Sequence, residues 1–377
     1  MMYKLLFFAL LITGGYIYVT TNDLVRIKNI ENVVSVSDLV STTTDTNIKD
    51  SVKSLTNKNK PVDLLPESKL VTGLSHVNQT FNNCSSVALM INLSRWGIQD
   101  TQEKIKEATR PWNNAKGDND DKSVNLFELA EYASSTYGLL TYVRPNGSIE
   151  ILKKFVANDI PVLTRTLMYP KDDIVHYRVI QGYDENNQIV VQSDGVEGKE
   201  VTYTYEKWMH AWKDFNYEYL IVVPKEKKEV VEKILADELN EEVAWKNAKE
   251  RAIKEISSNN NELWAHYNLI TAMFYLKDYE NVVKEFEKIE DKLSRRKLWY
   301  QHEPIYAYFN LGNYDKVIKM VDYIENDNNK SISELYVLKG KILEKRGDKE
   351  GARKEYEKAV YYHKYLKEAK DALNNLK

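Results

Sequence analysis

The residue with the clearest chemistry is Cys84, the single cysteine of the 377-residue chain. It precedes a run whose apolar residues recur at helical spacing as far as Gly97, so we expect Cys84 to begin a helix. The positive end of a helix dipole and the nearby amide donors favour the thiolate, which is the nucleophilic form of cysteine. Because a lone cysteine can also be a small buried apolar residue, this position alone does not establish catalysis.

A base and an acid are supplied by two later segments. His176 begins a strand-like run, residues 176–184 (HYRVIQGYD), which ends at a Gly-Tyr-Asp turn. Residues 188–195 (QIVVQSDG) form a second strand-like run, and the short connection predicts an antiparallel pair. This pairing would bring Asp194 back towards His176. A thiol, an imidazole and a carboxylate placed in this way provide the nucleophile, base and orienting group of a papain-type peptidase.

These segments resemble a known family of cysteine peptidases. Residues 79–84 (QTFNNC) and the run that starts at His176 are similar to the peptidases that process double-glycine bacteriocin leaders, and to their non-transporter, peptidase-like relatives. The resemblance implies an α+β papain-like domain that hydrolyses a peptide or protein substrate. It also implies that Cys84 is the nucleophile, His176 the base and Asp194 the orienting acid. Gln79 would then supply the side-chain donor of the oxyanion hole.

The residues that follow the cysteine depart from the family pattern. The family usually has Gly-Pro-Ala after its cysteine, whereas this chain has Ser-Ser-Val at residues 85–87. Serine is compatible with the first turn of a helix, and both Cys84 and His176 are present. The sequence therefore predicts a hydrolase of the thiol protease class, with two alternatives left open. One is a catalytically inactive peptidase-like protein that binds peptides or acts as a scaffold, and the other is thiol chemistry on a non-peptide substrate.

Other partners are disfavoured by composition and spacing. The chain has 53 basic and 56 acidic residues without a basic block, so we expect no nucleic acid partner. A zinc site made of His76, Cys84, His176 and Asp194 would lack the spacing of a known ligand pair, and the proposed triad uses the same residues. We expect no cofactor and no bound metal.

The C-terminal part of the chain repeats itself. The turn residues Asp278, Asn313 and Asp348 lie 35 residues apart, and apolar residues follow each turn at the spacing of one helix face. Each unit is therefore predicted to be a helix hairpin. The series resembles tetratricopeptide repeats over residues 240–377, with a candidate capping helix at residues 361–376.

Details of the repeats lead to further expectations. Ala272, Ala307 and Gly340 occur in the first helix of successive units, where small residues allow the helices to approach closely. Pro304 falls within the first helix of the middle unit, so we expect a kinked or irregular repeat there. The resemblance implies a protein partner on the repeat domain. A generic helical bundle is the alternative.

The N-terminus predicts export. Residues 5–19 are apolar and follow Lys4, which is typical of a signal peptide or a membrane anchor. We therefore expect an extracytoplasmic protein, either membrane-anchored at the cell surface or secreted. The predicted organisation is a signal peptide or anchor (1–21), a polar linker (22–65), a papain-like cysteine peptidase-like domain (66–224) and tetratricopeptide-like helical repeats (225–377).

Overall fold

The structure, a computed structural model, describes residues 11–13, 16–20, 24–26, 64–110, 124–169, 172–327 and 330–376. The chain divides into two units, residues 1–60 and residues 61–377. The second unit contains both the predicted peptidase domain and the predicted repeats.

The first unit is described only in three short strands. These are β1 (Leu11–Thr13), β2 (Tyr16–Thr20) and β3 (Leu24–Arg26), which pair in antiparallel fashion in the order β1-β2-β3. The predicted signal peptide or anchor and the predicted linker therefore lie largely outside the described residues. Over the described residues, no helix combines the length and the apolar character needed to cross a membrane.

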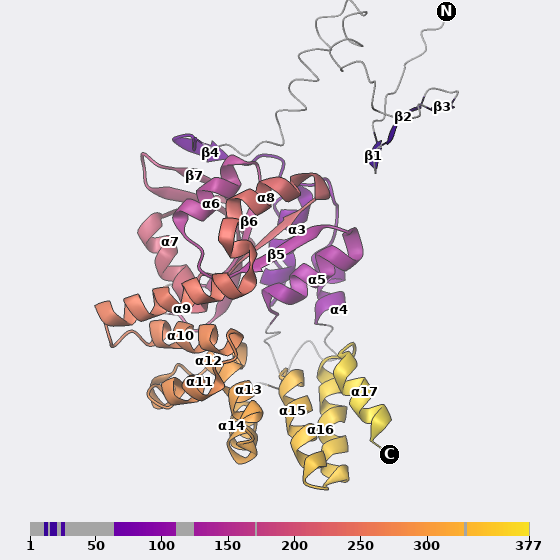
Figure 1. The fold of residues 1–377 in the computed structure, drawn as a ribbon, viewed down its shortest axis with the longest axis vertical. Coiled ribbons are helices and arrows are strands. Elements are labelled where there is room, and N and C mark those ends of the chain that lie inside the picture. Colours follow the sequence, from indigo (N-terminus) through magenta and orange to yellow (C-terminus); the bar gives the residue numbers. More distant parts are fainter. Residues whose placement is uncertain are drawn as a thin grey trace, which may run out of the picture. The chain divides into compact units, whose positions relative to one another are not determined.

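The second unit begins with a sheet that has seven antiparallel strands over the described residues (Figure 1). Six strands follow the order β5-β10-β6-β7-β8-β9, and β4 pairs with the C-terminal end of β7. The predicted pairing of the His176 strand with the next strand is confirmed. The strands are β4 (Ser68–Leu70), β5 (Leu140–Arg144), β6 (Val162–Leu167), β7 (Val175–Asp184), β8 (Ile189–Asp194), β9 (Gly198–Thr204) and β10 (Tyr219–Val223).

Both faces of this sheet are covered by helices, because its inner strands are apolar on both faces. In β10, Leu220 and Val222 pack with α3, α4 and α5, whereas Tyr219 and Ile221 pack with α6, α7 and α8. Successive side chains of a strand point to opposite faces, so one apolar strand serves two cores. These helices are α3 (Cys84–Ser94), α4 (Gln102–Thr109), α5 (Leu126–Tyr137), α6 (Ile149–Ala157), α7 (Tyr205–Trp212) and α8 (Lys228–Leu235).

The rest of the second unit is helical, and its turns lie where the 35-residue period predicts them. Helix hairpins are formed by α10 with α11, α13 with α14, and α15 with α16. A Cβ atom on Gly340 would lie 2.4 Å from the Tyr356 ring, so even alanine would clash and glycine is required where α15 meets α16. The helices are α9 (Glu241–Ser258), α10 (Leu263–Tyr275), α11 (Tyr279–Phe286), α12 (Lys297–Tyr300), α13 (Glu303–Asn310), α14 (Tyr314–Asn326), α15 (Ser333–Lys345), α16 (Lys349–Tyr362) and α17 (Lys367–Asn375).

Two details differ from the prediction. Pro304 does not kink a helix, because α13 begins at Glu303 and proline in a first turn forfeits no helical hydrogen bond. The middle unit is nevertheless irregular, as expected, because its predicted first helix is divided into α12 and α13. The capping helix also begins later than predicted, at Lys367, because apolar packing keeps α16 helical through Tyr362.

The helical region docks directly on the α+β part of the same unit. The Asn268 side chain of α10 accepts a hydrogen bond of 3.0 Å from the backbone N–H of Asn216. Arg296, just before α12, forms a 2.8 Å ion pair with Asp173. Asp173 lies three residues before His176, so the helical region reaches the segment that leads into the candidate site.

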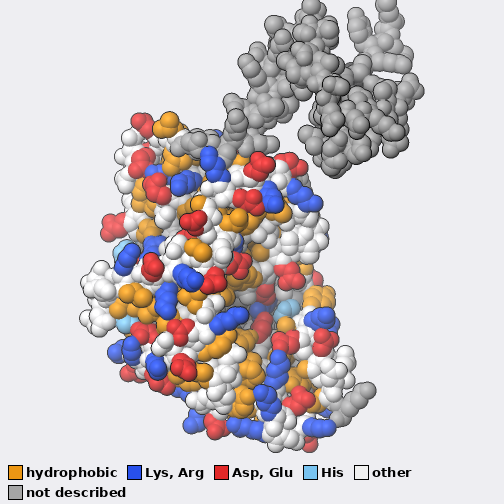
Figure 2. Space-filling view, viewed as in Figure 1, with side chains coloured by type: hydrophobic (Ala, Val, Ile, Leu, Met, Phe, Trp, Pro, Cys, Tyr) orange, Lys and Arg blue, Asp and Glu red, His pale blue; other side chains and the backbone are white. Residues whose placement is uncertain are grey.

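Most charged side chains lie at the surface, where both signs are interspersed over the face in view in Figure 2. Pairs such as Lys69 with Asp159, at 2.9 Å, are partly exposed, and so is the Arg296–Asp173 pair at the docking surface. An exposed pair contributes at most about 1 kcal/mol to stability, so these pairs do not explain how the helical region is held in place.

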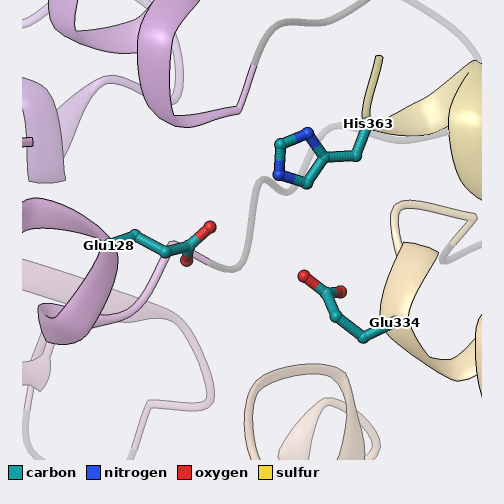
Figure 3. A group of neighbouring side chains, drawn as sticks. All are labelled: Glu128, Glu334 and His363. Carbon is teal, nitrogen blue, oxygen red and sulfur yellow. The ribbon is translucent and has the colours of Figure 1, made fainter. Parts of the chain in front are cut away.

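A group of charged residues around the buried Arg110 at the docking surface has a different character. Figure 3 shows Glu128 of α5, Glu334 of α15 and His363 after α16, whose ligand atoms lie within 4.8 Å of one another. Arg110, at the end of α4, bonds both carboxylates, with Nε 2.9 Å from Glu128 and Nη2 2.8 Å from Glu334. The guanidinium thus supplies the positive charge that this pair of carboxylates requires. We assign the cluster to docking rather than to a metal ion.

Replacing Arg110 tests this assignment. Arg110→Met would leave the partly buried Glu128 and Glu334 side by side without their cation. The expected cost is more than the about 1 kcal/mol of an exposed pair and less than the about 3–5 kcal/mol of breaking a fully buried pair. Lys364 forms an exposed pair with Glu107 across the same docking surface, so Lys364→Met should cost less than about 1 kcal/mol. Urea unfolding of both variants measures the difference. Equal losses in the two variants would contradict the assignment.

Candidate active site

His176 and Asp194 are in direct contact within the sheet. β7 begins at Val175, and Arg178 of β7 stands opposite Asp194 of β8 in the register. His176 and Arg178 are two residues apart on one strand, so their side chains share a face. The His176 Nε2 atom lies 2.9 Å from each carboxylate oxygen of Asp194, and both side chains are fully buried.

This contact defines which ring nitrogen of His176 can act as a base. An Nε2 atom that contacts a carboxylate donates its hydrogen, so the lone pair of the neutral ring lies on Nδ1. The Nδ1 atom is buried and has no hydrogen-bond partner among the described residues. Burial lowers the pKa of His176, and the nearby Arg178 acts in the same direction, while Asp194 partly opposes them. The neutral imidazole, which can accept a proton, is therefore the favoured form.

Asp194 is held as a carboxylate by several donors. Its Oδ1 atom accepts hydrogen bonds from the backbone N–H groups of Val196, at 2.7 Å, and Glu197, at 3.1 Å. Burial alone would raise the pKa of this carboxyl, but His176, Arg178 and the Val196 N–H outweigh it. The pKa of Asp194 therefore lies well below its usual range, and the group remains charged at neutral pH.

Cys84 begins α3, as the sequence predicts. The residue itself is half-buried, while the rest of α3 is buried and packs against β7 and β8. Asn83 stands at the N-cap position, but its side chain donates to the Thr80 hydroxyl at 2.6 Å and does not cap the helix. The first-turn amides of α3 thus have no side-chain cap from Asn83, and the helix dipole favours negative charge at the thiol.

Gln79 lies against the segment that follows Asp194. Its backbone N–H donates to the Gly195 carbonyl at 2.9 Å. A Cβ atom on Gly195 would lie 3.1 Å from both the Gln79 Cβ and the Val87 Cγ1, so only glycine fits between them without displacement. Val87 is one turn after Cys84. Gly195 therefore brings the Gln79 loop, the first turn of α3 and the acid-bearing strand into contact.

The loop that carries Gln79 is fixed by a residue without a role in the sequence analysis. The buried Gln102, at the start of α4, accepts from the Thr80 N–H at 2.8 Å and donates to the Asn78 carbonyl at 3.2 Å. It also accepts from the Asn83 side chain at 3.4 Å. No local pattern signals this role, because Gln102 lies far from the loop in sequence.

Arg178 also has no role in the sequence analysis, although it lies within the quoted motif. It is fully buried, and its Nε atom lies 2.8 Å from the Asp194 Oδ2 atom. The signal that could have identified it is its spacing from His176, because residues two apart on a strand face the same side. Its position opposite Asp194 depends on the strand register, which a single sequence does not fix.

The alternative zinc site gains no support from the described residues. The His76 Nε2 atom contacts the Asn78 side chain at 3.2 Å near the surface. His76, Cys84, His176 and Asp194 do not form a group of converging ligand atoms in the described part of the chain.

Residues 71–220 match the family model of the Peptidase_C39 like family. This part of the chain has a C39-like peptidase fold. The predicted architecture, a papain-like α+β domain followed by a helix-rich region, is confirmed. The match does not extend to the helical region, so its likeness to tetratricopeptide repeats stays a prediction.

Three solved structures are similar to the chain. A C39-like peptidase from Bacillus anthracis is 18% identical, with a TM-score of 0.37, covering 42% of this chain and 99% of its own. The peptidase domain of Streptococcus ComA, a bifunctional ABC transporter, is 14% identical, with a TM-score of 0.32. The match covers 41% of this chain and 100% of the ComA domain. A double-glycine-motif protease from an AMS/PCAT transporter, in complex with the leader peptide, is 16% identical, with a TM-score of 0.31. The match covers 44% of this chain and 98% of that protease. No curated protein matches the chain.

Three buried or partly buried histidines predict a loss of stability in acid. Burial lowers the pKa of His176, and lowers that of His302 and His363 to about 4. Their contribution to stability is complete above the unfolded-state pKa, and it is lost as the pH falls below about 6.5, because the unfolded chain then binds more protons. Urea unfolding between about pH 7.5 and pH 5 should show a falling free energy of unfolding. His176→Gln should make the free energy of unfolding depend less steeply on pH. An unchanged dependence would contradict the lowered pKa of His176.

Proposed function

We propose that this chain is a thiol peptidase that hydrolyses peptide bonds through Cys84, His176 and Asp194. The observation that carries the proposal is the contact of the His176 Nε2 atom with both oxygens of Asp194, which leaves the Nδ1 atom as the proton acceptor. The half-buried thiol at the start of α3 is the nucleophile. The match of residues 71–220 to a peptidase family supports the same chemistry.

Each group has a defined task in this reaction. As the Sγ atom of Cys84 attacks the carbonyl carbon, the Nδ1 atom of His176 takes the thiol proton. The backbone N–H of Cys84 and the side-chain NH₂ of Gln79 donate to the oxyanion. The imidazolium returns its proton to the leaving amine, and the acyl group remains as a thioester. A water molecule deprotonated by His176 then hydrolyses the thioester and regenerates the thiol.

Export and partner binding belong to the same proposal. The apolar residues 5–19 would direct the chain out of the cytoplasm and serve as a signal peptide or membrane anchor. The helical region would recruit a protein substrate or partner. A hollow of about 280 Å³ next to α14, lined in part by Leu293, Leu298 and Met320, supports this role. Tyr323 at this hollow is 61% exposed.

Alkylation of Cys84 tests the catalytic pair without knowledge of the substrate. Iodoacetamide should label Cys84 in the native full-length chain faster than in a denatured sample, since the helix dipole and His176 favour the thiolate. His176→Ala should reduce this rate on the order of tenfold or more, whereas His210→Ala, at an exposed histidine of α7, should leave it unchanged. Mass spectrometry of the labelled peptide gives the rates. Equal rates in the native, denatured and His176→Ala samples would contradict the assignment of the pair.

Turnover requires a separate measurement on a peptide library. The full-length chain should cleave library peptides, Cys84→Ala should abolish cleavage, and Gln79→Ala should lower kcat by about 10²- to 10³-fold. Fast, His176-dependent alkylation without any cleavage would favour the alternative, a peptidase-like protein that binds peptides. The Ser-Ser-Val sequence at residues 85–87 is the observation behind that alternative.

A further inference from the structure

We propose that Arg178 is a positioning residue that holds Asp194 towards His176 and balances its buried charge. The inference rests on the proposed function of Cys84 and His176. Arg178, His176 and Asp194 each have no exposed surface, so every charge in the group must be balanced from within the protein.

The geometry gives Arg178 two separate attachments. Its Nε atom lies 2.8 Å from the Asp194 Oδ2 atom, as an ion pair rather than a linear hydrogen bond. Its Nη1 and Nη2 atoms donate to the carbonyls of Leu167, at 2.8 Å, and Met168, at 2.5 Å. Nη1 also donates to the Thr166 hydroxyl. One side chain therefore ties the end of β6 to the acid on β8, with the His176 strand between them.

The charge of Arg178 has a specific consequence for the base. A buried carboxylate beside an imidazole would on its own draw a proton onto the ring and form an imidazolium–carboxylate pair. With the guanidinium in place, Asp194 is already neutralised, and His176 can stay neutral while its Nε2–H donates to the carboxylate. Its Nδ1 lone pair then remains available for the thiol proton.

The other charged groups near this pair are few. Glu197, which follows β8, raises the proton affinity of His176, and the Tyr203 hydroxyl of β9 donates to the Glu197 carboxylate at 2.8 Å. The Arg178 guanidinium carbon lies 5.7 Å from the Tyr203 ring centre. The Nζ atom of Lys207 lies 3.4 Å from the centre of the same ring. Among the described residues, Arg178 is thus the cation in direct contact with Asp194.

Two substitutions separate the charge of Arg178 from its shape. The rate of Cys84 alkylation should rise with pH in two steps, the limbs of the profile, which report the coupled titration of Cys84 and His176. Arg178→Met removes a nearby positive charge, so both limbs should move to higher pH by about one unit. Arg178→Lys keeps the charge but loses the fork to the β6 carbonyls. In this variant the limbs should stay at the wild-type pH, while the maximal alkylation rate, the plateau, falls on the order of tenfold. The rate falls because Asp194, and through it His176, is positioned less firmly. Arg178→Gln is a second uncharged variant, which should shift like Arg178→Met.

The outcomes distinguish this inference from the proposed function. If wild-type alkylation does not depend on His176, the proposed function fails. If it depends on His176 but the limbs of Arg178→Met or Arg178→Gln coincide with wild type, the role of Arg178 fails alone. Should neither uncharged variant fold, Arg178→Lys decides, since a full plateau or a moved limb in that variant overturns the inference. Urea unfolding of every variant shows which chains are folded during labelling.

Discussion

The site depends on one buried negative charge, that of Asp194. Moving a carboxylate out of water costs several kcal/mol unless donors replace the lost hydration. Here the replacement comes from the His176 ring N–H, from two backbone N–H groups of the turn after β8 and from the ion pair with Arg178. These groups converge only in one register of β7 and β8, because a slip of one residue would turn His176 and Arg178 to the opposite face. The two apolar cores that fix the register therefore also fix the site.

The parts of this arrangement that follow from local pattern could be predicted from the sequence. Helical spacing predicts the start of α3 at Cys84, and two strand-like runs with a short connection predict the β7–β8 pair. The 35-residue period predicts the helix hairpins for the same reason, since each hairpin is specified by neighbouring residues. The roles of Gln102 and Arg178 could not be predicted in this way. Gln102 contacts a loop that is distant in sequence. Arg178 contacts Asp194 only because of the register of the two strands.

The docking of the helical region likewise depends on contacts that no local pattern contains. Arg110 and Glu334 are separated by more than half of the chain, yet their side chains meet at 2.8 Å. The resemblance to tetratricopeptide repeats leads one to expect a concave face that is open to a partner. Part of the helical surface is instead used within the chain, through α10, α12 and α15. A partner would therefore meet a helical region whose orientation relative to the α+β domain is already set.

The departure at residues 85–87 can be understood from the packing around Cys84. Ser85 and Ser86 are buried in the first turn of α3, where small side chains are accommodated and proline is favourable but not required. Val87 is larger than the alanine usual in the family, and its Cγ1 atom approaches Gly195, which has no side chain. The larger side chain of Val87 thus fits because Gly195, on the segment after Asp194, has no side chain. The first turn of α3 and the segment after Asp194 remain in contact, so the departure changes the packing beside the thiol and leaves this contact in place.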